Sequence, residues 1–178
     1  MVFPLADLDQ IPDRRVTDIE KEIQFFNHCL SAVQNDMRGL HSQLAGQIAE
    51  EELQLFDVYV RMLDDDVLGN EVTQRIKQGS WAQGALSYVA KEHIKTFEMM
   101  NNEYLSERSV DIRDLCSRIL FYLQEKESIA VEYRENTILA SDELTPAMLV
   151  DVPKEKLRGL ISVKGSSNSH VAILARAM

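Results

Sequence analysis

The chain has 178 residues and a formal net charge of −10, with 45% hydrophobic and 27% charged residues. This length allows one large domain or two small ones, and the composition is ordinary for a globular protein. The acidic charge argues against nucleic acid as a partner, because phosphates need a basic surface, and it permits a basic protein partner. No apolar run approaches the roughly 20 residues that span a bilayer, and no signal peptide is recognisable, so we expect a cytoplasmic protein with no membrane partner.

The first half of the chain begins with a long predicted helix. Asp13 or Thr17 is expected to cap it, because Thr17 and Glu20 have the spacing of a capping box. Apolar residues then recur every three or four positions, which places them on one helix face. That face comprises Ile19, Ile23, Phe26, Leu30, Val33, Met37, Leu40 and Leu44.

Three further helical runs follow the first. The second extends from Ile48 to Leu68, where Gly69 interrupts the pattern without clearly ending it, and Gly79 provides a stop. Residues 81–100 form the third run and residues 105–123 form the fourth. Because short connections join these runs, they predict an antiparallel four-helix bundle.

The pattern changes near residue 128. Residues 129–131, 137–140 and 160–163 are predicted strands, and Pro146 is expected to open a short helix near residues 147–149. A glycine-containing loop and a final apolar helix complete an α/β pattern with few strands. We therefore expect an α+β protein in three parts, with an N-terminal connector, a helical bundle and a partial α/β domain. The predicted boundaries are residues 1–16, 17–124 and 125–178.

His170 has the clearest chemical context in the chain. It follows a loop of small residues, Gly165 to Ser169, and opens an apolar helical run. The backbone N–H groups of such a loop and of a helix N-terminus bind anions, so this place suits a phosphate. The helix dipole also disfavours imidazolium, which keeps the imidazole neutral and nucleophilic. The local chemistry predicts a phosphate-accepting histidine, although a histidine at a helix start most often has no chemical role.

The cysteines and the other histidines show no metal-ligand spacing, so no metal site is expected in this chain. Buried free thiols are the simplest interpretation of the cysteines, and structural roles are favoured for the histidines. These residues are Cys29, Cys116, His28, His41 and His93.

Several segments together resemble one family. Residues 165–178 resemble the phosphohistidine signature of phosphoenolpyruvate-utilising enzymes, which pyruvate phosphate dikinase also carries. Residues 102–114 and 56–66 resemble the final bundle helix and the carrier-meeting helix of enzyme I, the phosphoenolpyruvate–protein phosphotransferase of the bacterial phosphotransferase system. Residues 138–146 resemble the strand and turn that return its chain to the α/β domain. The segment Asn168–Ile173 is closer to the nitrogen-related branch of that family.

The resemblance implies a bundle inserted into a swivelling phosphohistidine domain. The family's opening strand with its Ser-Pro-Gly turn is absent, and the loop has Gly165-Ser166 where two glycines are common. The family continues beyond the position of Met178 to a barrel domain that binds phosphoenolpyruvate and Mg²⁺. The resemblance therefore implies an N-terminal fragment of an enzyme whose full-length form is a homodimer.

The resemblance also implies site residues. His170 is the phosphohistidine nucleophile, and a threonine at the position of Thr145 hydrogen-bonds the unphosphorylated imidazole. From the residues alone, Thr145 before Pro146 is equally a helix cap. The expected phosphate cradle comprises Gly165, Ser167, Asn168 and Ser169. The expected carrier-binding residues are Glu51, Phe56, Tyr59, Met62, Asp65 and Asp66, although adjacent acidic residues on a helix are also typical of a solvated face.

These observations predict a phosphotransferase component. In it, His170 accepts a phosphoryl group from phosphoenolpyruvate, bound on a domain outside this chain, and passes it to a histidine of a small carrier protein. Two alternatives stay open: a docking module with a silent histidine, and a fragment of a dikinase-type enzyme. The inserted bundle and the absence of a P-loop pattern speak against the dikinase.

Overall fold

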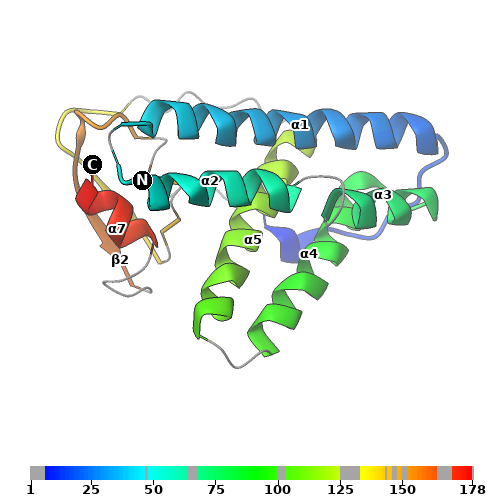
Figure 1. Cartoon of the computed structure of the whole chain (residues 1–178). Helices are drawn as coiled ribbons and strands as arrows, with labels where there is room; N and C mark the ends of the chain where they lie inside the picture. Colours follow the sequence, from blue (N-terminus) through cyan, green and yellow to red (C-terminus); the bar gives the residue numbers. More distant parts are fainter. Residues whose placement is uncertain are drawn as a thin grey trace.

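The computed structural model describes residues 7–46, 48–63, 68–99, 103–124, 133–142, 144–145, 148–149, 152–163 and 170–177. Within these residues, five helices pack together and a small two-stranded sheet lies at one end with a final helix (Figure 1). Helix α1 (Ile19–Leu44) lies antiparallel to α2 (Glu50–Leu63), and the hairpin of α4 (Ala82–Met99) and α5 (Glu103–Leu123) crosses that pair. The predicted α+β class is confirmed.

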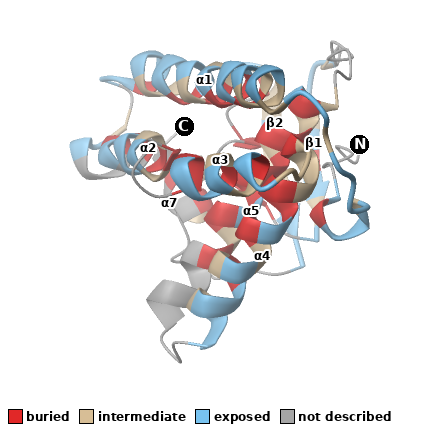
Figure 2. Ribbon diagram, turned by 90° about the vertical axis from the view of Figure 1, so that its right-hand side faces the viewer, coloured by how far each residue is buried: buried red, intermediate tan, exposed pale blue. Residues whose placement is uncertain are grey.

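Helix α1 buries the predicted face. Phe26, Val33 and Met37 are fully buried, and the buried positions form a stripe turned toward the other helices (Figure 2). The predicted N-caps, Asp13 and Thr17, are wrong. The side chain of Asp18 caps the helix instead and accepts a hydrogen bond of 3.1 Å from the backbone N–H of Lys21. A carboxylate in this position satisfies one of the unpaired N–H groups of the first turn.

The second predicted run contains two helices rather than one. Helix α2 ends at Leu63, and α3 (Asn70–Lys77) begins after Gly69, which has helical backbone angles and no side-chain cap. The stop at Gly79 is confirmed, since its N–H donates to the carbonyl of Ile76 and its φ of +96° is a conformation that favours glycine.

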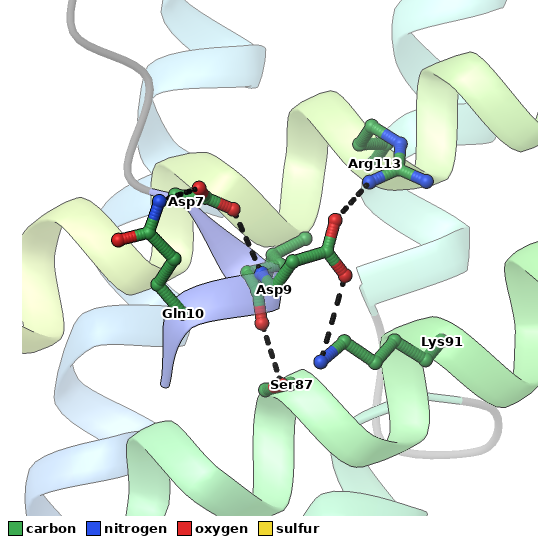
Figure 3. Close-up of polar contacts among 7 residues, drawn as sticks. Asp7, Asp9, Gln10, Ser87, Lys91 and Arg113 are labelled. Carbon is green, nitrogen blue, oxygen red and sulfur yellow. Dashed lines mark hydrogen bonds and ion pairs between the residues drawn. The ribbon is translucent and has the colours of Figure 1, made fainter. Parts of the chain in front are cut away.

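Residues 7–16 belong to the predicted N-terminal connector, and in the structure they pack closely on the bundle. Leu8, in the short 3₁₀ helix η1 (Leu8–Gln10), is 2% exposed and belongs to the bundle core. Its carbonyl accepts a hydrogen bond of 2.7 Å from Ser87 on α4 (Figure 3). The carboxylate of Asp9 lies 3.5 Å from both Lys91 on α4 and Arg113 on α5. The segment therefore joins the two helices of the hairpin.

The sheet consists of β1 (Thr137–Ser141) and β2 (Leu157–Ser162), which pair in parallel with an irregularity between Thr137 and Ile138. Of the predicted strands, residues 129–131 lie outside the described residues, and the third begins earlier than expected and ends before Val163. A second apolar cluster fills one face of the sheet. It comprises Leu139, Leu144, Met148, Val152 and Val171. No helix in the described parts of the chain has the length and apolarity needed to cross a membrane.

Candidate functional site

His170 is the first residue of helix α7 (His170–Ala177), as predicted. The first turn of α7 contains no acidic residue, so no carboxylate of its own competes for the N-terminal N–H groups. The imidazole and the cradle loop, with Gly165, Ser167, Asn168 and Ser169, lie outside the described residues. Their roles therefore remain predictions.

Helix α7 contacts both parts of the molecule. Val171, directly after His170, belongs to the apolar cluster of the sheet, whereas Leu174 is 3% exposed and belongs to the core of the bundle. In the bundle, α7 contacts α2. The apolar run after His170 predicted a helix, but it could not predict that this helix contacts two different cores.

Thr145 is buried, with 5% of its surface exposed, and lies in the turn before the short helical segment at Met148 and Leu149. Its Oγ1 accepts a hydrogen bond of 3.3 Å from the N–H of Met148, and its carbonyl accepts one of 3.2 Å from Leu149. The capping role is confirmed. The flanking Leu144 and Met148 pack in the same cluster as Val171, so this turn lies beside the start of α7. A hydrogen bond from Thr145 to the imidazole stays a prediction.

Two of the predicted carrier-binding residues are in the core, which corrects the sequence-based assignment. Phe56 is fully buried and Tyr59 is 2% exposed, so neither ring offers a surface to a partner. The rings make an edge-to-face contact with centroids 6.1 Å apart. The three-residue spacing correctly placed them on one face of α2, but that face is turned inward. Met62 is half-buried.

The remaining predicted carrier contacts are not described: the side chain of Glu51 and both Asp65 and Asp66 lie outside the described parts of the chain. The outward face of α2 carries a different set of residues. These are Glu50, Gln54, Asp57, Val58 and Arg61. Val58 is a large exposed apolar side chain at 38%, and Asp57 lies 3.8 Å from His41 on α1.

Tyr59 has a polar partner that the sequence did not reveal. Its phenol donates a hydrogen bond of 2.8 Å to Asp111 on α5, a carboxylate that is itself 7% exposed. Asp114, 6% exposed, accepts from Arg118 at 3.3 Å. Both acidic residues are buried, although carboxylates are mostly found at the protein surface. The sequence contains one indication of this contact, because the phenol of a buried tyrosine usually needs a hydrogen-bond partner.

The burial predicted for the two cysteines is confirmed. Cys29 and Cys116 are buried free thiols. Burial above all, and next the charge of Asp114, raise the pKa of the Cys116 thiol from 9.0 to about 12 against the opposing charge of Arg113. Among the described residues, no group of three or more histidines, cysteines or carboxylates is placed to hold a metal ion.

This architecture, a helical bundle packed on a small unit whose last helix opens with histidine, has clear relatives. Residues 2–108 match the family described as PEP-utilising enzyme, N-terminal, and residues 133–178 match PEP-utilising enzyme, mobile domain. The chain therefore belongs to the PEP-utilising enzyme family, whose N-terminal region it contains. The family predicted from the sequence is confirmed.

Among curated relatives, the chain is 29% identical to the phosphoenolpyruvate-dependent phosphotransferase system protein of Escherichia coli K12, over 96% of this chain and 23% of that protein. It is also 29% identical to the phosphoenolpyruvate-protein phosphotransferase of Staphylococcus epidermidis, over 97% of this chain and 30% of that protein. The chain thus spans about a quarter of these relatives' length.

Two solved structures have the same fold. One is described as the N-terminal domain of Enzyme 1 - Nitrogen, with 30% identity, a TM-score of 0.72 and coverage of 99% of this chain and 71% of that one. The other is a solution structure of Enzyme I, nEIt, with 27% identity, a TM-score of 0.74 and coverage of 94% and 69%.

Proposed function

We propose that this chain is the phosphohistidine and carrier-docking part of a phosphoenolpyruvate–protein phosphotransferase of the nitrogen-related branch. The observation that carries the proposal is the position of His170 as the first residue of α7, beside the capped turn at Thr145. A neutral imidazole there attacks the phosphorus of phosphoenolpyruvate. The bond to the enol oxygen breaks, a phosphorus–nitrogen bond forms, and the enolate takes up a proton to become pyruvate.

The phosphoryl group then passes from His170 to a histidine of a small carrier protein. Positioning and electrostatic stabilisation dominate such transfers, which suits a site built from helix N–H groups. We place the docking surface for this carrier on the outward face of α2, around Asp57, Val58 and Arg61. Its exposed apolar side chain among charged neighbours has the composition of a transient interface. Asp65 and Asp66, which follow α2 in sequence, add acidic charge for a basic carrier.

The phosphoenolpyruvate site belongs in this proposal to a domain outside the chain. The described residues hold no carboxylate cluster of the kind that Mg²⁺ needs, so we assign no step here to that ion. The proposed whole enzyme is a cytoplasmic homodimer in which Mg²⁺ assists phosphoenolpyruvate. The chain's own residues supply the nucleophile, its placement and the carrier surface.

Two other functions fit part of the observations. A docking module with a silent histidine would use the same α2 surface, and a dikinase-type enzyme would share the phosphohistidine helix. The match of residues 2–108 to the N-terminal family and the enzyme I structures favours the phosphotransferase over the dikinase.

The deciding experiment incubates the 178-residue chain with a phosphorylated carrier protein and locates the label by mass spectrometry. We expect label on His170 and none in His170→Ala, whose circular dichroism should match the parent. Phosphoenolpyruvate with Mg²⁺ alone should give no label. Label on His28, His41 or His93, or no label at all, would overturn the proposal.

A further inference from the structure

A group of arginines lies at the end of the bundle opposite the phosphohistidine helix. Helix α3 and the turn after it are at one end of the bundle, whereas α7 and the sheet are at the other (Figure 1). A backbone bridge between Arg15 and Ser80 fastens the N-terminal segment to this turn. Three arginines lie near this turn. Two belong to the N-terminal segment and one belongs to α3. They are Arg14, Arg15 and Arg75.

Each arginine is held in place by a neutral group. The guanidinium of Arg14 lies 4.8 Å from the ring centre of Trp81, and that of Arg75 lies 3.3 Å from the ring centre of Tyr88. Arg15 donates a hydrogen bond of 2.9 Å to the carbonyl of Gln78. Stacking and carbonyl contacts fix the side chains without cancelling their charges.

Three of the carboxylates near this end contact other groups, while Asp13, directly before Arg14, is exposed. Asp18 accepts from the backbone of Lys21, and Glu22 accepts a bond of 2.6 Å from the N–H of Ala82. Glu71 lies 2.9 Å from His93. Within the described part of the chain, no carboxylate ion-pairs with the three arginines. Three arginines that form no ion pair with a described carboxylate therefore lie at one end of a protein whose net charge is −10.

Trp81, the aromatic partner of Arg14, is fixed in position by its contacts. The indole N–H of Trp81 donates a hydrogen bond of 3.0 Å to the carbonyl of Pro12. The ring also occupies the space above Gly84, where an added Cβ would lie 2.5 Å from the indole nitrogen. A fixed indole costs little side-chain entropy on binding. Tryptophan and arginine are both enriched at the energetic centres of protein interfaces.

We propose that this end, defined by Arg14, Arg15, Arg75, Trp81 and Tyr88, is a docking surface for an acidic segment of another protein. Guanidinium groups stacked on rings leave their N–H edges available to carboxylates. A basic carrier would be repelled here, so this surface is separate from the carrier surface on α2. A short acidic segment brings little charge beyond the residues that contact the arginines. A second copy of this chain or a nucleic acid brings a much larger negative charge against the net charge of −10.

The test uses Trp81, the single tryptophan of the chain, as a built-in fluorescent reporter. The 178-residue protein is titrated with a short peptide of alternating aspartate and glutamate. We expect a saturable fluorescence change whose midpoint rises with salt. Arg14→Gln and Arg75→Gln should each weaken binding by about two- to fivefold, since each removes one exposed ion pair. Arg38→Gln, which removes one exposed charge from α1, is the matched control and should bind like the parent.

Three results would overturn the proposal. The first is a peptide titration that does not saturate, or one that Arg38→Gln weakens as much as Arg75→Gln. The second is an equal effect from inorganic phosphate at matched charge, which would indicate simple screening. The third is tighter binding of a single-stranded DNA with the same dependence on the arginines. Because His170 lies at the opposite end, carrier-dependent labelling should be unchanged in these variants, so this proposal and the proposed function can fail independently.

Discussion

The phenol of Tyr59 on α2 donates a hydrogen bond of 2.8 Å to the carboxylate of Asp111 on α5, and both side chains are buried. This contact joins the helix we assign to carrier docking to the last helix of the bundle. A carboxylate taken out of water needs such donors, because its desolvation is costly.

Tyr59→Phe is therefore expected to destabilise the protein by about 1–3 kcal/mol, the usual cost of leaving a buried polar group without a donor. The ring stays in the core, so the loss reports the hydroxyl alone. Tyr122→Phe is the matched control: it removes a similar bond of 2.7 Å to Asp36, but at an exposed site. Its effect should stay below about 0.5 kcal/mol. Urea unfolding of both variants measures the difference, and equal losses would contradict a special role for the buried bond.

The N-terminal segment should be held by apolar burial more than by its ion pairs. Leu8 is 2% exposed, so Leu8→Ala should cost about 2–4 kcal/mol. Asp9→Asn removes two ion pairs whose side chains are all more than a third exposed, and it should cost less than about 1 kcal/mol. Thermal or urea unfolding distinguishes them. A larger loss for Asp9→Asn would mean that the pairs in Figure 3 dominate the attachment.

Substitutions of Thr145 can distinguish a structural role of its hydroxyl, as a helix cap, from a chemical role at the His170 imidazole. Thr145→Val keeps the volume and loses the hydroxyl, so it should cost about 1 kcal/mol, while Thr145→Ser should retain the cap. If the hydroxyl also orients the imidazole, the valine variant should slow carrier-dependent labelling and shift the NMR titration of His170, and the serine variant should not. A valine variant that loses stability but labels at the parent rate would leave Thr145 as a cap only.

Cys116 should make stability fall in alkaline solution. Burial raises its pKa from 9.0 to about 12, so the folded protein retains a proton that the unfolded chain loses. Stability from this group is fully present below about pH 9 and is lost as the pH rises toward 12. The free energy of unfolding should therefore decline more steeply above pH 9 in the parent than in Cys116→Ala. Parallel pH profiles would contradict the assignment, as would rapid reaction of the native protein with a thiol reagent.

The sequence predicted what depends on local pattern. The three- and four-residue recurrence in α1 identified its buried face, and the small-residue loop before His170 identified the start of α7. It could not predict contacts between distant segments. The burial of Asp111 depends on its partner Tyr59, which is 52 residues away in the chain. Periodicity likewise showed that Phe56 and Tyr59 share a face, but only the packing of α2 on α1 and α7 shows that this face is inward.

Carrier docking should follow the outward face of α2. Val58→Asp places a charge on an exposed apolar side chain and should weaken carrier binding with little effect on stability. Phe56→Ala should instead cost about 3–5 kcal/mol of stability, because the ring is fully buried. Reversing Asp65 and Asp66 to lysine should slow association with a basic carrier and reduce its salt dependence, while helix content stays unchanged.

An NMR titration with the carrier measures these effects together. Shifts are expected at Gln54, Asp57, Val58 and Arg61, which share the exposed face of the helix. Lys95→Gln, an exposed change on α4, serves as the control and should associate at the parent rate, because it removes charge away from this surface. If the shifts cluster in residues 17–30 and spare residues 50–66, the carrier docks on α1 instead.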